Sequence, residues 1–290
     1  APFRRLLTAM ATPFSSDGSL DLEQARRLAA YLVDEQGNDA LVINGTTGES
    51  PTTDDDEKRQ LLRAVKDEVG DRAKVIAGVG TNETAATIGR CRDAADAECD
   101  GVLVVTPYYS KPPADALLEH FQIVADSTDL PVMLYDIPGR SAIPIPEDTL
   151  IELARHPRIV AVKDAKGDLV SSAKVMSCTD LAYYSGDDAV TLPLMSIGGV
   201  GVVGTSTHFT GAATREWMDL LADGAHDEAL AVYRRLLPVY TGVFATQGCM
   251  LVKAGLAARG FGPAVLRRPL KPASSAQART FVQVLEAAGL

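Results

Sequence analysis

The chain alternates between short apolar runs and longer segments whose apolar positions recur at helical spacing. Eight runs stand out, namely "LLTAMATPF" from Leu6, "ALVIN" from Ala40, "KVIAGVG" from Lys74, "GVLVVTP" from Gly101, "PVMLYDIP" from Pro131, "IVAVKDA" from Ile159, "LAYYSGD" from Leu181 and "GVGVVGTS" from Gly199. Because these runs are continuously apolar, they indicate strands covered on both faces, as in a parallel sheet.

The segments between the runs have the patterns of amphipathic helices. Residues 21–37 begin with a capping aspartate and end at a glycine. Residues 53–70 place Asp54, Asp55 and Asp56 at a helix start, where carboxylates complement the helix dipole. We interpret these three residues as a helix start, and ligand contact is the alternative.

Eight strand–helix repeats predict an α/β fold, a (β/α)₈ TIM barrel over residues 1–225. A doubly wound open sheet is the alternative. It would usually carry a Gly-x-Gly-x-x-Gly turn after the first strand, where this chain has "TPFSSDGS". Residues 226–290 contain helical patterns without strand patterns, which predicts a C-terminal helical bundle appended to the barrel.

Composition and charge limit the classes of binding partner that this protein can have. The formal net charge is −10, which disfavours nucleic acid and anionic membranes as partners. No apolar run approaches the ~18 residues of a membrane span. The first residues lack the pattern of a signal peptide. We therefore expect a cytoplasmic protein that binds small molecules.

Cysteine and histidine spacings offer no metal site. The four cysteines, Cys91, Cys99, Cys178 and Cys249, show no Cys-x-x-Cys pair and are interpreted as buried reduced thiols. The four histidines are scattered, without a His-Glu-x-x-His motif. We expect no bound metal.

Polar and glycine-rich motifs collect where predicted strands end. They are "NGTTGES", "TPYYSKP", "YDIPGRS", "KDAKGD" and "SGDD". Active sites of (β/α)₈ barrels lie at the C-terminal ends of the strands. The motifs therefore predict an active site at that end.

Lys163 is the first candidate because it ends an apolar strand. Strict alternation would put Ile159, Ala161 and Lys163 on the inner face and Val160 and Val162 on the outer one. Burial would lower the pKa of the amine from about 10.4 to about 7.5, at a cost of about 4 kcal/mol to the charged form. A neutral amine can form a Schiff base with a ketone. The alternative for Lys163 is a structural ion pair with Asp164 or Asp187. The loop lysines Lys111 and Lys166 are expected to be solvated.

Three neighbours of this strand end supply complementary chemistry. Tyr135 could relay protons, or simply pack in the core. A Pro-Gly turn would place Arg140 at the rim, where it could grip a carboxylate or be a lone surface residue. The glycines around Thr46 and Thr47 expose successive N–H groups that can bind an anion.

Taken together, "GTTGES", "TPYYSKP", "YDIPGRS" and "KDAKGD" resemble, in this order, the dihydrodipicolinate synthase family. That family is one of the pyruvate-dependent class I aldolases, related to N-acetylneuraminate lyase. The resemblance spans nearly the whole chain. It implies a carbon–oxygen lyase of lysine and diaminopimelate biosynthesis that condenses pyruvate with L-aspartate 4-semialdehyde. It also implies no cofactor and a homotetramer built as a dimer of dimers.

The resemblance assigns roles to residues of this chain. The catalytic positions would be Lys163 as the Schiff-base lysine, with Tyr135, Thr46 and Tyr109 as the proton relay, Tyr109 reaching in from a neighbouring subunit. The substrate-binding positions would be Thr46, Thr47, Arg140, Gly186 and Val203.

Some positions depart from the family pattern. Asp136 stands where many relatives have Asn, and His208 stands where an Asn is common. The resemblance also implies an L-lysine inhibition site at a dimer interface, matched by Ser50, Asn82 and Tyr108. Inhibited members often carry His or Glu where this chain has Asp55, Lys58 and Ala86, so weak or absent inhibition is expected.

Two other functions are open to this sequence. Another pyruvate-dependent aldolase, cleaving sialic acid or a 2-keto-3-deoxy sugar acid, would use Lys163 and Tyr135 equally. The double threonine, Tyr109 and Arg140 argue against it. A non-catalytic paralogue that senses a keto acid is the second alternative, although every expected catalytic residue is present.

Overall fold

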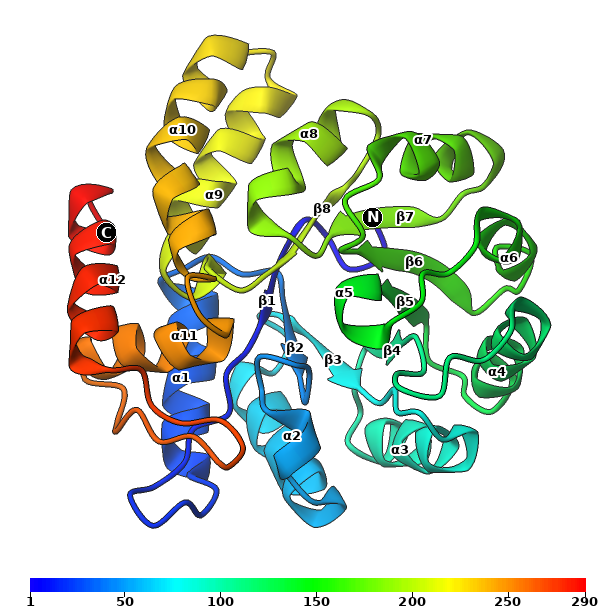
Figure 1. The fold of residues 1–290 in the computed structure, drawn as a ribbon, viewed down its shortest axis with the longest axis horizontal. Coiled ribbons are helices and arrows are strands. Elements are labelled where there is room, and N and C mark those ends of the chain that lie inside the picture. Colours follow the sequence, from blue (N-terminus) through cyan, green and yellow to red (C-terminus); the bar gives the residue numbers. More distant parts are fainter.

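The strands form one closed parallel barrel in sequential order, β1 to β8, with β8 paired to β1 (Figure 1). A computed structural model describes residues 1–290. The strands are β1 (Leu6–Ala9), β2 (Ala40–Ile43), β3 (Lys74–Gly78), β4 (Gly101–Val105), β5 (Val132–Asp136), β6 (Ile159–Asp164), β7 (Ala182–Ser185) and β8 (Gly201–Gly204). The predicted TIM barrel is confirmed, and closure rules out the open doubly wound sheet.

Helices surround the barrel and extend it at the C-terminus (Figure 1). They are α1 (Leu22–Asp34), α2 (Asp55–Val69), α3 (Thr84–Asp96), α4 (Ala114–Asp126), α5 (Pro138–Ser141), α6 (Glu147–Leu153), α7 (Leu169–Cys178), α8 (Thr191–Ser196), α9 (Thr207–Ala222), α10 (His226–Gly242), α11 (Gly248–Ala258) and α12 (Ser275–Ala287), with 3₁₀ turns η1 (Ser50–Thr52) and η2 (Asp188–Val190).

Two of the predicted helix starts are confirmed. The Asp21 side chain accepts from the N–H of Gln24 and caps α1. Asp54 and Glu57 form a capping box at the start of α2, and Asp55 and Asp56 occupy its first turn. The acidic run is therefore a helix start, as its charge pattern predicts.

Strand side chains divide between two apolar clusters. Val42, Met133 and Ala161 belong to the cluster inside the barrel. Leu134 and Val162 belong to the larger cluster between strands and helices. Because every strand is covered on both faces, the continuously apolar runs are explained.

The expected alternation along β6 fails at its first two residues. The pairing of β5 with β6 shifts between Val132 and Met133, so that Val132 faces Ile159 and Met133 faces Ala161. Ile159 consequently packs in the outer cluster and Val160 against the inner one. The irregularity inserts one residue into the pairing and reverses the faces before it, while Ala161 and Lys163 keep the predicted inward face.

The N-terminal end of the barrel is filled. Tyr184 points to the start of the chain, where its hydroxyl donates to the Arg4 carbonyl at 2.8 Å and accepts from the Phe3 N–H at 3.2 Å. Phe3 and Tyr184 are both buried in the inner cluster. Space inside the barrel is therefore left at the opposite end, where the polar motifs lie.

Helices α10–α12 gather on one side of the barrel, beside α9 and α1 (Figure 1). The expected boundary after residue 225 falls in the short turn between α9 and α10. Apolar clusters cross this boundary: Trp217 and Tyr240 share one with Leu6 of β1. The C-terminal helices are thus part of the barrel's packing. No helix has the length and apolar character needed to cross a bilayer.

The cysteine prediction is wrong at one position. All four cysteines are free thiols, but Cys178 is exposed at the end of α7, whereas the other three are buried. Nothing in the local sequence pattern separates the exposed thiol from the buried ones.

Candidate active site

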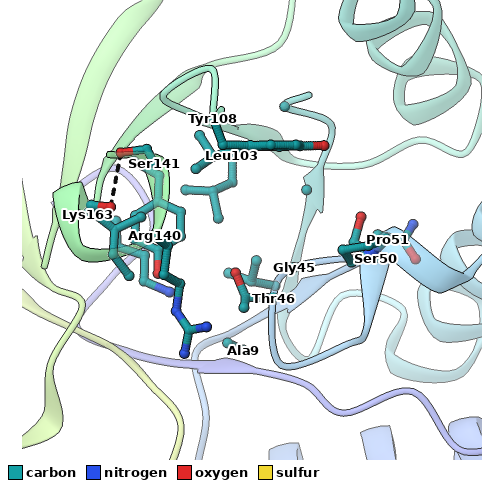
Figure 2. Close-up of a pocket in the computed structure, with 17 residues that line it drawn as sticks. Ala9, Gly45, Thr46, Ser50, Pro51, Leu103, Tyr108, Arg140, Ser141 and Lys163 are labelled. Atoms are coloured by element: carbon teal, nitrogen blue, oxygen red, sulfur yellow. Dashed lines mark hydrogen bonds between the residues drawn. The ribbon is translucent and has the colours of Figure 1, made fainter. Parts of the chain in front are cut away.

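A cavity of about 240 Å³ opens at the C-terminal end of the barrel and contains Thr46, Tyr135, Arg140 and Lys163. Figure 2 shows Lys163 and Arg140 on one side of it and Thr46 and Ser50 on the other. A smaller cavity adjoins it at Lys163. It is lined by Thr46, Thr47, Tyr135, Ile137, Arg140, Lys163, Gly186, Thr205, Phe244, Gln247, Gly248 and Cys249. Four strands, β2, β5, β6 and β7, and the loops after them thus bring six of the predicted catalytic and substrate-binding residues together.

Lys163 has a buried amine that forms no ion pair with a residue of its own strand, β6. It is 5% exposed, and its Nζ lies 4.3 Å from the centroid of the Tyr135 ring. Burial lowers the pKa of Lys163 to about 8, opposed by the charge of Asp188 and assisted by that of Arg140. A large neutral fraction near physiological pH makes the amine a competent nucleophile.

The alternative ion pairs of Lys163 do not form. Asp164 turns outward, where its side chain accepts from the Ser172 hydroxyl and from the Lys166 N–H. The Asp187 side chain accepts from the Ala189 N–H at the start of η2. The structure therefore favours the nucleophile interpretation over a structural ion pair.

Tyr135 stands beside Lys163 as its pairing partner on β5. Burial raises the pKa of Tyr135 to about 12, partly offset by the guanidinium of Arg140 and by a hydrogen bond with Thr46. The phenol therefore stays protonated and can donate or pass on a proton, as a relay requires.

The loop after β2 has two unused backbone donors. The N–H groups of Gly48, Glu49 and Ser50 bond back to carbonyls of the same loop, whereas those of Thr46 and Thr47 donate to no backbone carbonyl. Thr46 lines both cavities and Thr47 the smaller one. Two successive free amides beside a buried amine form a site for a small carboxylate.

Arg140 reaches the cavity from a single helical turn, α5, instead of the expected tight turn. Pro138 starts this turn and Ala142 ends it in the left-handed region, at φ 70°. The exposed Arg140 lines both cavities, and its charge acts on Tyr135 and Lys163. It can therefore bind an anion next to the nucleophile.

Lys166 is not solvated, contrary to expectation. Its side chain is 7% exposed, and its Nζ lies 3.5 Å from Oδ2 of Asp136. The other oxygen of Asp136 accepts from the Ile145 N–H at 3.1 Å. Burial raises the pKa of Asp136 to about 6, opposed by Lys166. Asp136 thus lies behind the site, on the outer face of β5, where it binds the far end of the segment that carries Arg140.

His208 is a structural residue. It is fully buried, its Nδ1 bonds the Thr205 carbonyl at 2.8 Å, and its Nε2 accepts from the Ala11 N–H at 3.0 Å. Burial lowers the pKa of His208 to about 4, so the ring is neutral and donates from Nδ1. It connects the ends of β1 and β8 beside Thr205.

Gly186 leaves room for the nucleophile. A Cβ at this position would lie 3.1 Å from Cε and 3.2 Å from Cγ of Lys163, and 2.9 Å from Cβ of Ala165. Real Cβ atoms rarely approach so closely, so the Lys163 side chain would have to move.

If pyruvate is the substrate, as the resemblance implies, we expect Gly186→Ala to lower the rate of adduct formation by about 10²-fold, because the amine is displaced from its reactive position. Trapping with borohydride measures this rate. Gly89→Ala is the control, since a Cβ there meets nothing within 4 Å. An unchanged rate in Gly186→Ala would show that the lysine side chain has a second productive path.

Three predicted positions line neither cavity, and two more line only the larger one. Val203 is fully buried in the inner cluster, and Tyr109, with φ 75°, is 88% exposed and lines neither cavity of its own chain. Asn82 lies outside them but bonds Thr81, whose hydroxyl is 3.4 Å from that of Tyr108. Tyr108 and Ser50 line the larger cavity.

Sequence reasoning missed several residues at the site. Asp188 is buried, accepts from the N–H groups of Thr205 and Ser206, and is the carboxylate that acts on Lys163. Asp188 could have been predicted, because it belongs to "SGDD", one of the polar motifs that directly follow a strand. No sequence pattern marks Phe244 and Gln247 as site residues. They follow the last strand by about 40 residues and reach the barrel only through the C-terminal helices.

Comparisons with known proteins agree with this geometry. The family model described as the dihydrodipicolinate synthetase family matches residues 2–288. A 4-hydroxy-tetrahydrodipicolinate synthase of Cutibacterium acnes is 60% identical over 98% of this chain and 97% of its own length. One of Acidothermus cellulolyticus is 58% identical over 100% and 94%.

The fold also matches that of a solved structure. The lysine-bound enzyme of Cyanidioschyzon merolae superimposes with a TM-score of 0.96 at 40% identity, covering 100% of this chain and 99% of that one. Since the family model and close relatives cover essentially the whole sequence, this chain belongs to the dihydrodipicolinate synthetase family.

Proposed function

We propose that this chain is a 4-hydroxy-tetrahydrodipicolinate synthase, which condenses pyruvate with L-aspartate 4-semialdehyde through a Schiff base on Lys163. The name of its relatives supports the activity. The observation that carries the mechanism is the buried amine of Lys163, with its lowered pKa, beside the Tyr135 phenol and the free amides of Thr46 and Thr47.

The residues support each chemical step. The neutral amine adds to the pyruvate ketone, water leaves and an iminium forms, while Tyr135 and Thr46 pass protons to and from the departing oxygen. A methyl proton is then lost, and the resulting enamine carbon attacks the aldehyde, whose oxygen is protonated. The substrate's own amino group finally attacks the iminium carbon and releases Lys163 as the ring closes.

The two carboxylates of the substrates have separate binding groups. The free Thr46 and Thr47 amides suit the pyruvate carboxylate, with Gly186 lining the same cavity and Val203 in the inner apolar cluster of the barrel. Arg140 stands at the rim and suits the carboxylate of the semialdehyde.

Tyr109 fits a role in a neighbouring subunit. An 88% exposed tyrosine with a left-handed backbone is unusual on a free surface. We infer that it enters the site of an adjacent copy in a homotetramer and completes the relay with Tyr135 and Thr46. Mixing Tyr109→Phe and Lys163→Met variants tests this inference, because mixed assemblies should recover part of the activity.

The test of the overall proposal is a coupled assay. Pyruvate and L-aspartate 4-semialdehyde are supplied, and the product is reduced by dihydrodipicolinate reductase with loss of NADPH absorbance. We expect turnover that needs both substrates. Folded protein that traps pyruvate but gives no turnover would instead indicate an aldolase with another acceptor.

Adduct formation should depend on pH. The pKa of Lys163 is about 8, so the rate of trapping should rise with pH and level off above that value. Arg140 lowers this pKa, so Arg140→Met should move the midpoint to higher pH. Trapping with pyruvate alone measures the midpoint. A rate independent of pH would contradict the lowered pKa.

L-Lysine should inhibit weakly or not at all. Lys58 is buried, and its Nζ donates to the carbonyl of Thr53, whose hydroxyl bonds the carbonyl of the predicted inhibitor position Ser50. Burial, and secondly the charge of Arg90, lower the pKa of Lys58. Two cations oppose binding of a third. Titration with lysine in the coupled assay measures this effect, and a submillimolar inhibition constant would refute it.

A further inference from the structure

The C-terminal helices reach the loop that carries Thr46 and Thr47. Glu49, two residues beyond Thr47, is 2% exposed and holds a left-handed backbone at φ 54°. This conformation is uncommon outside glycine and persists only when surrounding contacts enforce it. The loop is therefore held in place by something outside itself.

Both oxygens of the Glu49 carboxylate are held from the C-terminal part of the chain. Lys253 of α11, itself 5% exposed, donates from Nζ to Oε1. The Arg267 N–H donates to Oε2 at 3.0 Å. Lys253 donates also to the Val265 carbonyl at 2.7 Å. Charges taken out of water in this way are tolerated only when paired and hydrogen-bonded, so the contact is directional.

Arg267 adds a second attachment to the same loop. Its guanidinium donates to the Thr52 carbonyl at 2.9 Å and binds both oxygens of Glu57 at 2.6 Å. The Lys253 Nζ and the Arg267 guanidinium lie 4.1 Å and 4.3 Å from the centroid of the Phe14 ring. Both cations therefore pack on one buried aromatic ring, Lys253 buried and Arg267 partly exposed.

The opposite side of the loop is fixed by the barrel itself. The Thr12 hydroxyl donates to the Gly48 carbonyl at 2.7 Å. A Cβ on Gly48 would come within 3.1 Å of the Met10 carbonyl oxygen, so the loop lies close against the end of β1. Between Gly48 and Glu49, the loop is held from both sides.

We propose that Glu49, Lys253 and Arg267 form a clamp through which the C-terminal helices hold the Thr46 and Thr47 amides in the orientation that binds a carboxylate. The proposal rests on the function proposed above for these amides. None of the three clamp residues lines either cavity. Lys253 and Arg267 are therefore positioning residues, acting on pyruvate binding through the loop.

Removing one partner should disturb the loop and leave the nucleophile in place. Without Lys253, the buried Glu49 carboxylate loses its ion-pair partner and keeps only the Arg267 N–H and the nearby Arg267 charge, so the loop should open to hydrate it. Lys163 and Arg140 belong to β6 and α5, and no hydrogen bond or ion pair of the three clamp residues reaches either element. The expected defect is weaker pyruvate binding with little change at saturation.

The experiment compares Lys253→Met with Arg259→Met by trapping with borohydride and pyruvate alone. Arg259 ends the same helix but binds the Tyr31 hydroxyl of α1, far from the loop. We expect the half-saturating pyruvate concentration to rise ten- to a hundredfold, on the order of what misplaced binding groups cost. The control should be unchanged. Arg267→Met, with a partly exposed side chain, should give a smaller rise.

Two outcomes would overturn the clamp. Lys253→Met could lower thermal stability as the control does and leave half-saturation within about twofold. Alternatively, it could fail to fold while Arg267→Met binds pyruvate normally. A double variant with Glu49→Gln should be no worse than the poorer single variant, because both break one unit.

The outcome is separable from that of the proposed function. Trapping needs no second substrate, so absence of synthase turnover leaves this test intact. If the wild-type chain traps no pyruvate, the clamp is tested instead by hydrogen exchange of the loop amides. Exchange should accelerate in residues 45–50 of Lys253→Met and not in Arg259→Met, and equal exchange in both would refute the clamp.

Discussion

We expect Lys163→Met to abolish pyruvate adduct formation and at the same time to make the folded protein more stable. The variant loses the only buried amine in the cavity, so turnover should fall by about 10⁴-fold or more, as when other covalent nucleophiles are removed. Mass measurement after borohydride treatment should show no adduct. Residual trapping at another lysine would contradict the assignment.

The stability gain follows from the lowered pKa. The folded state holds the ammonium of Lys163 at a pKa of about 8 against 10.5 for the free side chain. The folded state therefore binds this proton less well than the unfolded state. The penalty is fully present below pH 8 and is relieved as the pH rises through 8 toward 10.5. At neutral pH it amounts to about 3 kcal/mol.

Denaturant unfolding at neutral and at alkaline pH measures this gain. The wild-type chain should become more stable as the pH rises through this window, and Lys163→Met should lack that rise. Lys166→Met is the matched control of opposite sign, because it leaves Asp136 buried without its cation. A destabilised Lys163→Met variant would mean that methylene packing outweighs the cost of the charge.

Tyr135→Phe should lower turnover by about 10²- to 10⁴-fold, the range typical of lost acid–base catalysis. The ring that lies 4.3 Å from the Lys163 amine is retained, and only the hydroxyl that bonds Thr46 is removed. Pyruvate half-saturation should change little, since the Thr46 and Thr47 amides are untouched. The rate of imine formation should fall with the turnover.

Tyr184→Phe is the matched control. Tyr184 is the pairing partner of Lys163 on its other side, but its hydroxyl bonds the Arg4 carbonyl at the closed end of the barrel. Its loss should affect stability and leave catalysis nearly unchanged. Similar losses in both variants would indicate that ring packing, and not proton transfer, explains the effect of Tyr135.

The apolar pattern was enough to predict the eight strands, their parallel arrangement and the end of the barrel that bears the site. Each strand is covered on both faces, so a buried strand can be recognised in the sequence as an unbroken apolar run. The polar motifs follow the strands directly, and parallel strands in a barrel present their C-terminal ends at one opening. Thr46, Tyr135, Arg140 and Lys163 could be placed together on this basis.

Local pattern was insufficient wherever pairing or long-range packing intervened. Alternation misplaced Ile159 and Val160, because the irregular pairing with β5 inserts one residue that no local signal marks. Lys166 looks like a loop lysine, yet a buried carboxylate on the neighbouring strand draws it inward.

The sequence by itself determined the barrel, its open end and the position of the proposed nucleophile, because these depend on the order of apolar runs and on residues adjacent to them. Only the tertiary structure decided how the site is supported. Lys253 and Arg267 lie more than 200 positions from Glu49 in the chain, and they meet it only after the last helices fold back over the closed barrel. Such contacts depend on the packing angles of whole helices, which no periodicity in the sequence records.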